Sequence, residues 1–204
     1  PSAFYGCTGL NDVDLGINLE KIDANAFNGC KGIKEIALPD TLKILRYCAF
    51  QNCTSLRTVD FGDGLSTMEN SVFEDCSALS EVTFGANLAT IGERAFVNCV
   101  ALNKINWGEN VSLISEKAFL GCKGLRSLNI PATVKTIEDY AFDGADGITE
   151  LTLSEGLTSI GVGAFLKCSR AQSVTVPNSV TKMGRSAFEN CESLKTVTIG
   201  TGLT

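Results

Sequence analysis

Apolar residues recur along this chain with a fixed spacing of 23 residues. The clearest marker is a phenylalanine, preceded by Ala in most copies and once by Val, that returns as Phe4, Phe27, Phe50, Phe73, Phe96, Phe119, Phe142, Phe165 and Phe188. A constant period of this length is typical of stacked supersecondary units rather than of a globule with one unique core. We therefore expect residues 1–204 to form a single repeat array of about nine coils.

Within each copy the spacing of apolar residues changes. From Ile91 to Cys99 the steps are three and four residues, which favours one or two helical turns over residues 93–99. Such a short helix is unstable alone, so burial of Phe96 must stabilise it. After Leu102 the period becomes two, because apolar Ile105 alternates with polar neighbours. That alternation predicts a short strand with one buried face.

A Gly, Pro or Ser follows each predicted strand and ends it in a turn. One coil cannot bury its apolar columns, but coils stacked about 4.8 Å apart can. The expected fold is therefore a repeat solenoid with one parallel β-sheet along one face and short helical turns or extended segments opposite. The chain begins and ends within a repeat, so we expect it to be a fragment of a longer protein whose capping repeats are missing.

Charge and hydropathy narrow the classes of partner. The net charge is −6, and the 17 Lys and Arg residues are scattered, which argues against nucleic acid binding. No apolar stretch is long enough to span a bilayer, so no membrane insertion is expected in this segment, and no signal peptide is expected within this fragment.

Cysteine is frequent, but its placement indicates packing. Eight of the nine cysteines occupy one column, in which Ala145 stands in the seventh coil; they are Cys7, Cys30, Cys53, Cys76, Cys99, Cys122, Cys168 and Cys191. A ladder of buried free thiols is expected, since stacked side chains point the same way and do not form disulfides. Zinc is disfavoured because there is no His and no C-x-x-C pair. Cys48 lies in a mostly polar column, where we expect it to be exposed.

The sequence contains few residues that could form a catalytic, cofactor-binding or metal-binding site. Without His the chain has no Ser-His or Cys-His pair, and no phosphate-binding glycine loop is present, so we expect neither an enzyme nor a cofactor. Asp12, Asp14 and Asp60 could hold a calcium ion weakly, but Ala37 separates Asp14 from Asp60 and a solvated face is the favoured interpretation.

The outward face of the sheet remains as the candidate binding face. Its residues are short and polar, without the aromatic side chains that supply most binding hot spots, and extended solenoid surfaces of this kind commonly bind partners. The candidate residues are Asp12, Asp14, Glu35, Thr58, Asp60, Glu81, Thr83, Lys104, Asn106, Ser127, Asn129, Glu150, Thr152, Thr175 and Thr198.

Two residues depart from the repeat pattern. Trp107 replaces a smaller apolar residue. It is interpreted either as a larger side chain that fills the core or as a partly exposed anchor for a partner at the sheet. Ala171 stands where other coils carry Leu or Ile, which predicts a packing gap and a weaker coil.

The repeat motif L-x-x-I-x-x-x-A-F-x-x-C-x-x-L-x-x-I-x-I-P resembles the BspA-like class of leucine-rich repeats, the 23-residue type also found in treponemal proteins, over essentially the whole chain. The resemblance implies a secreted or cell-surface protein associated with adhesion. We expect a non-catalytic module that recognises a protein or glycan ligand, including host extracellular matrix. The alternative is a structural spacer or self-assembling element without a ligand of its own.

Overall fold

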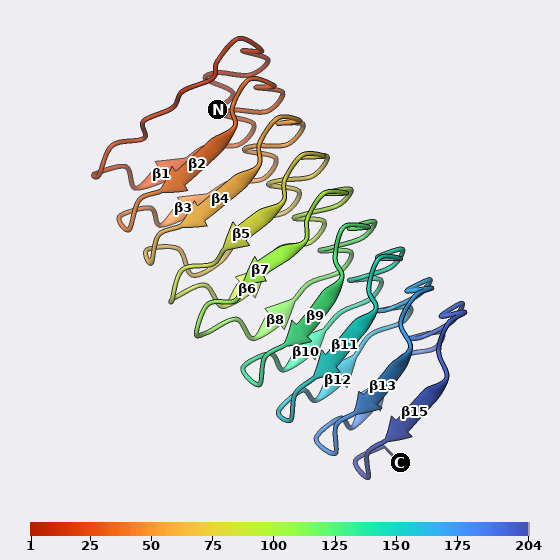
Figure 1. Ribbon diagram of the computed structural model, residues 1–204. Helices are drawn as coiled ribbons and strands as arrows, with labels where there is room; N and C mark the ends of the chain where they lie inside the picture. The colour runs from red at the N-terminus through yellow and green to blue at the C-terminus, as the bar shows by residue number, and fades with distance from the viewer. Residues whose placement is uncertain (204) are drawn as a thin grey trace.

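The computed structural model describes residues 1–203 as an elongated solenoid in which successive coils stack in one direction (Figure 1). We call each 23-residue unit a coil and number the coils from residue 1. Every strand pair is parallel, and partners are 23 residues apart, as in Glu35 with Thr58. The predicted repeat solenoid is therefore confirmed.

The longer strands form what we call the main sheet. Most of them alternate between exposed and buried residues, as the period of two predicts, for example in the order exposed, buried, exposed, buried along Glu35–Leu38. In the last strand, Thr196–Ile199, all four residues are exposed. The strands are β2 (Glu35–Leu38), β4 (Thr58–Phe61), β5 (Glu81–Thr83), β7 (Lys104–Asn106), β9 (Ser127–Ile130), β11 (Glu150–Leu153), β13 (Ser173–Val176) and β15 (Thr196–Ile199).

The extended segments of the coils form a second layer of two-residue strands, which we call the second sheet. The five strands from Thr90–Ile91 onwards pair continuously, whereas the two strands before them pair only with each other. The strands are β1 (Lys21–Ile22), β3 (Ile44–Leu45), β6 (Thr90–Ile91), β8 (Leu113–Ile114), β10 (Thr136–Ile137), β12 (Ser159–Ile160) and β14 (Lys182–Met183).

The helical turns expected over residues 93–99 are not formed. Within coil 5 the N–H of Val97 donates to the C=O of Arg94, which closes a tight turn, while Phe96 donates to the C=O of Ala118 in the next coil at 2.8 Å. Because the backbone groups bond to the neighbouring coil, they are not available for the i to i−4 bonds of a helix. The segment is a stack of turns.

These turns depend on two left-handed residues in every coil. The first column, with φ from 54° to 58°, is Ser2, Asn25, Cys48, Ser71, Arg94, Lys117, Tyr140, Gly163 and Ser186. The second column, with φ from 58° to 75°, is Gly6, Gly29, Asn52, Asp75, Asn98, Gly121, Gly144, Lys167 and Asn190. A residue with a Cβ atom is strained in this region, and Gly is not.

Replacing Lys167 by Gly should therefore stabilise the protein. Lys167 has φ of 58°, and Gly occupies the same column in four other coils. Relief of the left-handed strain should raise the free energy of unfolding by about 1 kcal/mol, measured by urea denaturation. Lys123→Gly, at an exposed turn residue without positive φ, is the matched control and should be neutral or destabilising. Equal effects of the two variants would contradict this explanation.

Side chains of identical columns stack into ladders in the core. The nine marker phenylalanines stack with ring centroids 5.1 to 5.5 Å apart, as Phe96 does on Phe119. The predicted thiol ladder is also confirmed, because every cysteine is free and those in the central coils are buried. Each buried thiol donates to the phenylalanine carbonyl of the preceding coil, for example from Cys99 Sγ to Phe73 O at 3.2 Å.

The predicted parallel main sheet is confirmed, but its hydrogen-bond ladder is interrupted twice. Within the described chain the sheet consists of β2-β4-β5-β7, β9-β11 and β13-β15. The second interruption, between β11 and β13, lies beside Ala171, in the coil for which the sequence predicts weaker packing. In the first coil no strand forms at Val13–Leu15, the position equivalent to Ile36–Leu38 in the next coil. There the Asp14 carboxylate accepts a hydrogen bond from the N–H of Gly16 at 2.8 Å, a local bond that competes with a strand ladder.

Candidate functional site

All fifteen candidate residues lie on the outward side of the main sheet or in the equivalent positions of the first coil. Twelve of them are exposed, and Glu81, Thr83 and Asn106 are half-buried. The residues nevertheless do not form one uniform surface, because the interruption between β7 and β9 separates the first nine from the last six.

The two parts of this face differ in chemistry. The first four coils carry the carboxylates of Asp12, Asp14, Glu35, Asp60 and Glu81, whereas the last four carry mainly hydroxyl and amide side chains. The N-terminal half of the face is therefore the charged half, and it attracts partners of complementary charge.

Glu81 is held in a local network at the edge of the charged half. Its carboxylate pairs with Lys104 Nζ at 2.5 Å and accepts a hydrogen bond from Asn106 Nδ2 at 2.9 Å. The hydrogen bond from Lys104, followed by that from Asn106, lowers the pKa of Glu81. Glu81 therefore remains ionised and fixed in position.

The charged half is hollowed over β2 and β4. One hollow of about 890 Å³ begins at Lys34 and Arg57, and a second of about 360 Å³ continues towards Asp40 and Asp63. Both hollows are lined by Ala37 and Asp60. Together they form what we call the charged trough, which is open above Ala37 because this side chain is only a methyl group.

Cations line only one end of the charged trough. Lys34 and Arg57 lie at the start of the strands, where the carboxylates of Asp12, Glu35 and Glu81 also line the hollow. At the other end the charged residues are Asp40, Asp60 and Asp63, all carboxylates. In residues 1–203, neither cation is within ion-pair distance of a carboxylate. Both cations lie outside the candidate stripes on the strands; they occupy the column just before each strand, which places them in adjacent coils.

Trp107 is half-buried and packs as a core filler. Its ring lies 5.9 Å from that of Phe84 and 6.2 Å from that of Phe119 between ring centroids. The same residue lines a small hollow of about 190 Å³ with Ile105 and Leu128, so its ring is not fully covered.

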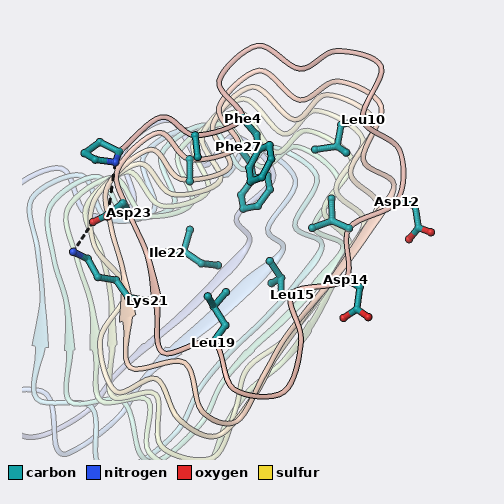
Figure 2. Close-up of a pocket in the computed structure, with 14 residues that line it drawn as sticks. Phe4, Leu10, Asp12, Asp14, Leu15, Leu19, Lys21, Ile22, Asp23 and Phe27 are labelled. Atoms are coloured by element: carbon teal, nitrogen blue, oxygen red, sulfur yellow. Dashed lines mark ion pairs between the residues drawn. The ribbon is translucent and has the colours of Figure 1, made fainter.

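A further hollow, of about 460 Å³, lies at the N-terminal end of the core (Figure 2). It is lined by Phe4, Leu10, Leu15 and Phe27, which belong to the apolar columns that adjacent coils cover elsewhere in the array. The ion pair of Lys21 with Asp23 at 2.7 Å lies at its rim. This hollow is therefore the kind of surface on which the neighbouring coil packs elsewhere in the array.

The remaining candidate residues, proposed from the sequence as a calcium site or a reactive thiol, do not form such a site. Within residues 1–203 no three His, Cys, Asp or Glu side chains are arranged to hold a metal ion, so Asp12, Asp14 and Asp60 do not form a calcium site there. Cys48 is half-buried rather than exposed, and burial, followed by the nearby Glu74 carboxylate, raises its pKa. A raised pKa disfavours the reactive thiolate. The described chain also has no helix that could cross a membrane.

Comparison with known proteins identifies the array. The BspA type leucine rich repeat region matches residues 1–126 and 89–204. Among solved structures, the leucine-rich repeat protein of T. pallidum is similar with a TM-score of 0.69 and 29% identity, over 74% of this chain and 71% of that one. No curated protein matches.

Two more distant structures share the fold. A leucine-rich repeat protein from Bacteroides ovatus has a TM-score of 0.50 and 22% identity over 99% of this chain and 70% of that one. The pneumococcal vaccine antigen PcpA has a TM-score of 0.56 and 21% identity over 92% of this chain and 55% of that one. Because the family match extends over the whole sequence, the chain belongs to the BspA-type leucine-rich repeat family.

Proposed function

We propose that this chain is a non-catalytic recognition module that binds protein partners in the charged trough. The observation that supports this proposal is the uneven placement of charges in the trough, with the two cations Lys34 and Arg57 at one end only and Asp40, Asp60 and Asp63 at the other. An extended polypeptide segment with side chains of both signs, in the opposite order, complements this arrangement. Exposed charges of this kind contribute mainly to partner selection and to the rate of association.

Family membership supports two further parts of the proposal. BspA-like repeats are associated with secreted or surface proteins, so we place this module outside the cell or on its surface and assign it a role in adhesion. The matching partner is an extracellular protein, such as a host matrix protein.

Binding to an array of extracellular matrix proteins and glycans tests this proposal. The wild-type protein should bind at least one matrix protein saturably, and Asp60→Lys combined with Glu35→Lys should weaken that binding by about tenfold or more. Higher salt should weaken it as well, because the charges are exposed.

The matched control is Thr175→Lys combined with Thr198→Lys, which adds two cations to the same face far from the trough. This variant should bind within about twofold of wild type. Equal loss in both double variants, or binding to glycans alone, would contradict a protein site in the charged trough.

A further inference from the structure

The main sheet opens between β7 and β9, in coils 5 and 6. No Cα atom of β7 lies within 8 Å of one in β9, whereas paired strands lie about 4.8 Å apart. Between β11 and β13, where the ladder is also broken, Cα atoms still approach within 8 Å. Only the gap between β7 and β9 therefore approaches the roughly 9.6 Å, or two strand spacings, that one inserted strand requires.

The rest of the structure keeps the two coils together. β8 pairs with both β6 and β10 in the second sheet. On the turn side, Arg94 N–H donates to Glu116 O at 3.0 Å and Asn98 N–H to Leu120 O at 2.9 Å. Coils 5 and 6 are thus joined along two sides and separated along the third.

Trp107 explains why the opening is here. Its column holds the smaller residues Leu15, Leu38, Phe61, Phe84, Ile130, Leu153, Val176 and Ile199 in the other coils. The indole packs inward against Phe84 and Phe119, the latter in the next coil. An oversized side chain in a packed core displaces the backbone, and the main-sheet side is where this displacement occurs.

The gap leaves the edges of two strands without partners. In the regular register, Lys104 N–H donates to Ser80 O at 3.1 Å and Glu150 N–H to Arg126 O at 3.2 Å. The equivalent bond, from Ser127 to Asn103, is missing, and in residues 1–203 no backbone hydrogen bond joins residues 103–107 to residues 126–130. By the same register, the N–H and C=O groups of Ile105, Ser127 and Asn129 face the gap.

The floor of the gap is apolar. The hollow of about 190 Å³ is lined by Ile105, Trp107, Leu125 and Leu128, with Ser127 and Asn129 as its polar members. This combination of unpaired strand edges and an apolar floor is the arrangement to which an added strand binds, with its main chain on the edges and alternate side chains in the floor.

We propose that the gap between β7 and β9 accepts one extended segment of a partner polypeptide as an additional strand of the main sheet. The inserted strand pairs with β7 on one side and β9 on the other, and it places one apolar side chain over Trp107 and Leu128. This inference deepens the proposed function, since the partner is again a polypeptide, but it uses residues that the charged trough does not contain.

Hydrogen exchange tests whether the edges are free. The amides of Ser127 and Asn129 should exchange about tenfold or more faster than those of Glu150 and Thr152, their equivalents in β11, which pairs with β9. Equal protection at these two pairs of amides would show that β7 and β9 are bonded in solution and would overturn the proposal.

Binding of a synthetic peptide tests whether an extended segment enters the gap. The probe is a labelled synthetic peptide with the sequence of residues 124–132, which carries the register of the sheet itself. It should bind saturably and change the emission of Trp107, the single tryptophan of the chain. A scrambled peptide, and the same peptide with N-methyl groups on the amides that would pair, should bind at least tenfold more weakly.

Trp107→Leu restores a residue that is common in this column and should close the gap. This variant should fold, protect the amides of Ser127 and Asn129, and bind the peptide at least tenfold more weakly by fluorescence anisotropy. The variant with Glu35→Lys and Asp60→Lys should bind the peptide with the affinity of wild type. This result distinguishes a failure of the proposal for the charged trough from a failure of the proposal for the gap. Equal peptide binding by wild type and Trp107→Leu would overturn the proposal.

Discussion

Raising the pH above about 9 should destabilise this protein steeply, because its thiol ladder is buried in the protonated form. Burial raises the pKa of Cys53 to about 12 and holds the pKa values of Cys76, Cys99, Cys122 and Cys168 well above the ordinary value of 9.0. In the unfolded chain the thiols ionise near their ordinary pKa. The folded state therefore keeps protons that the unfolded state loses, and its stability falls as pH rises.

The expected effect is large because the ladder contains several such thiols. The stabilisation is fully present below about pH 9 and is lost towards the raised pKa of the folded state. Each thiol protonated only in the folded state changes the free energy of unfolding by about 1.4 kcal/mol per pH unit. Five thiols give on the order of 7 kcal/mol per pH unit, which is comparable to the total stability of a typical domain.

Urea denaturation at pH 8, 9, 10 and 11 measures this slope. Cys99→Ala is the informative variant, because Ala145 shows that the column accepts alanine with the site fully buried. Its stability should fall with pH less steeply than that of wild type, by about one thiol, or 1.4 kcal/mol per pH unit. Identical slopes for the two proteins would show that the buried thiols do not cause the alkaline unfolding.

Phe119→Ala should destabilise the array by about 3 to 5 kcal/mol. The side chain is completely buried and stacks between Phe96 and Phe142 at 5.1 Å on each side. Its loss removes apolar burial, leaves a cavity and breaks two aromatic contacts in the ladder. Because the surrounding coils are joined by backbone ladders on the turn side, they cannot collapse fully into the space.

Phe4→Ala is the matched control in the same column. Phe4 is 46% exposed and stacks on Phe27 alone, so its truncation should cost less than about 2 kcal/mol. Urea denaturation of both variants at neutral pH measures the difference. Similar losses for Phe4 and Phe119 would mean that stacking within the ladder, and not burial, governs the contribution of this column.

The sequence by itself determined which side chains avoid water. The fixed period predicted the solenoid, the alternation around Ile105 predicted the main-sheet strands, and the cysteine column predicted the thiol ladder. These features could be predicted because burial recurs every 23 residues, so that a column of similar apolar residues indicates a buried position. The outward stripes of the main sheet follow from the same alternation, and with them all fifteen candidate positions.

Only the tertiary structure decided which groups the backbone amides and carbonyls form hydrogen bonds with. The turn segment around Phe96 has helix-like spacing, yet its amides bond to the next coil, so left-handed turns replace the expected helix. The two-residue strands of the second sheet are too short to produce a periodic signal. The charged trough brings together Lys34, Arg57, Ala37 and Asp60 from neighbouring coils, and the gap at Trp107 depends on how far one indole displaces a strand. Such features depend on contacts between residues about one repeat apart and on packing volume, which the order of polar and apolar residues does not encode.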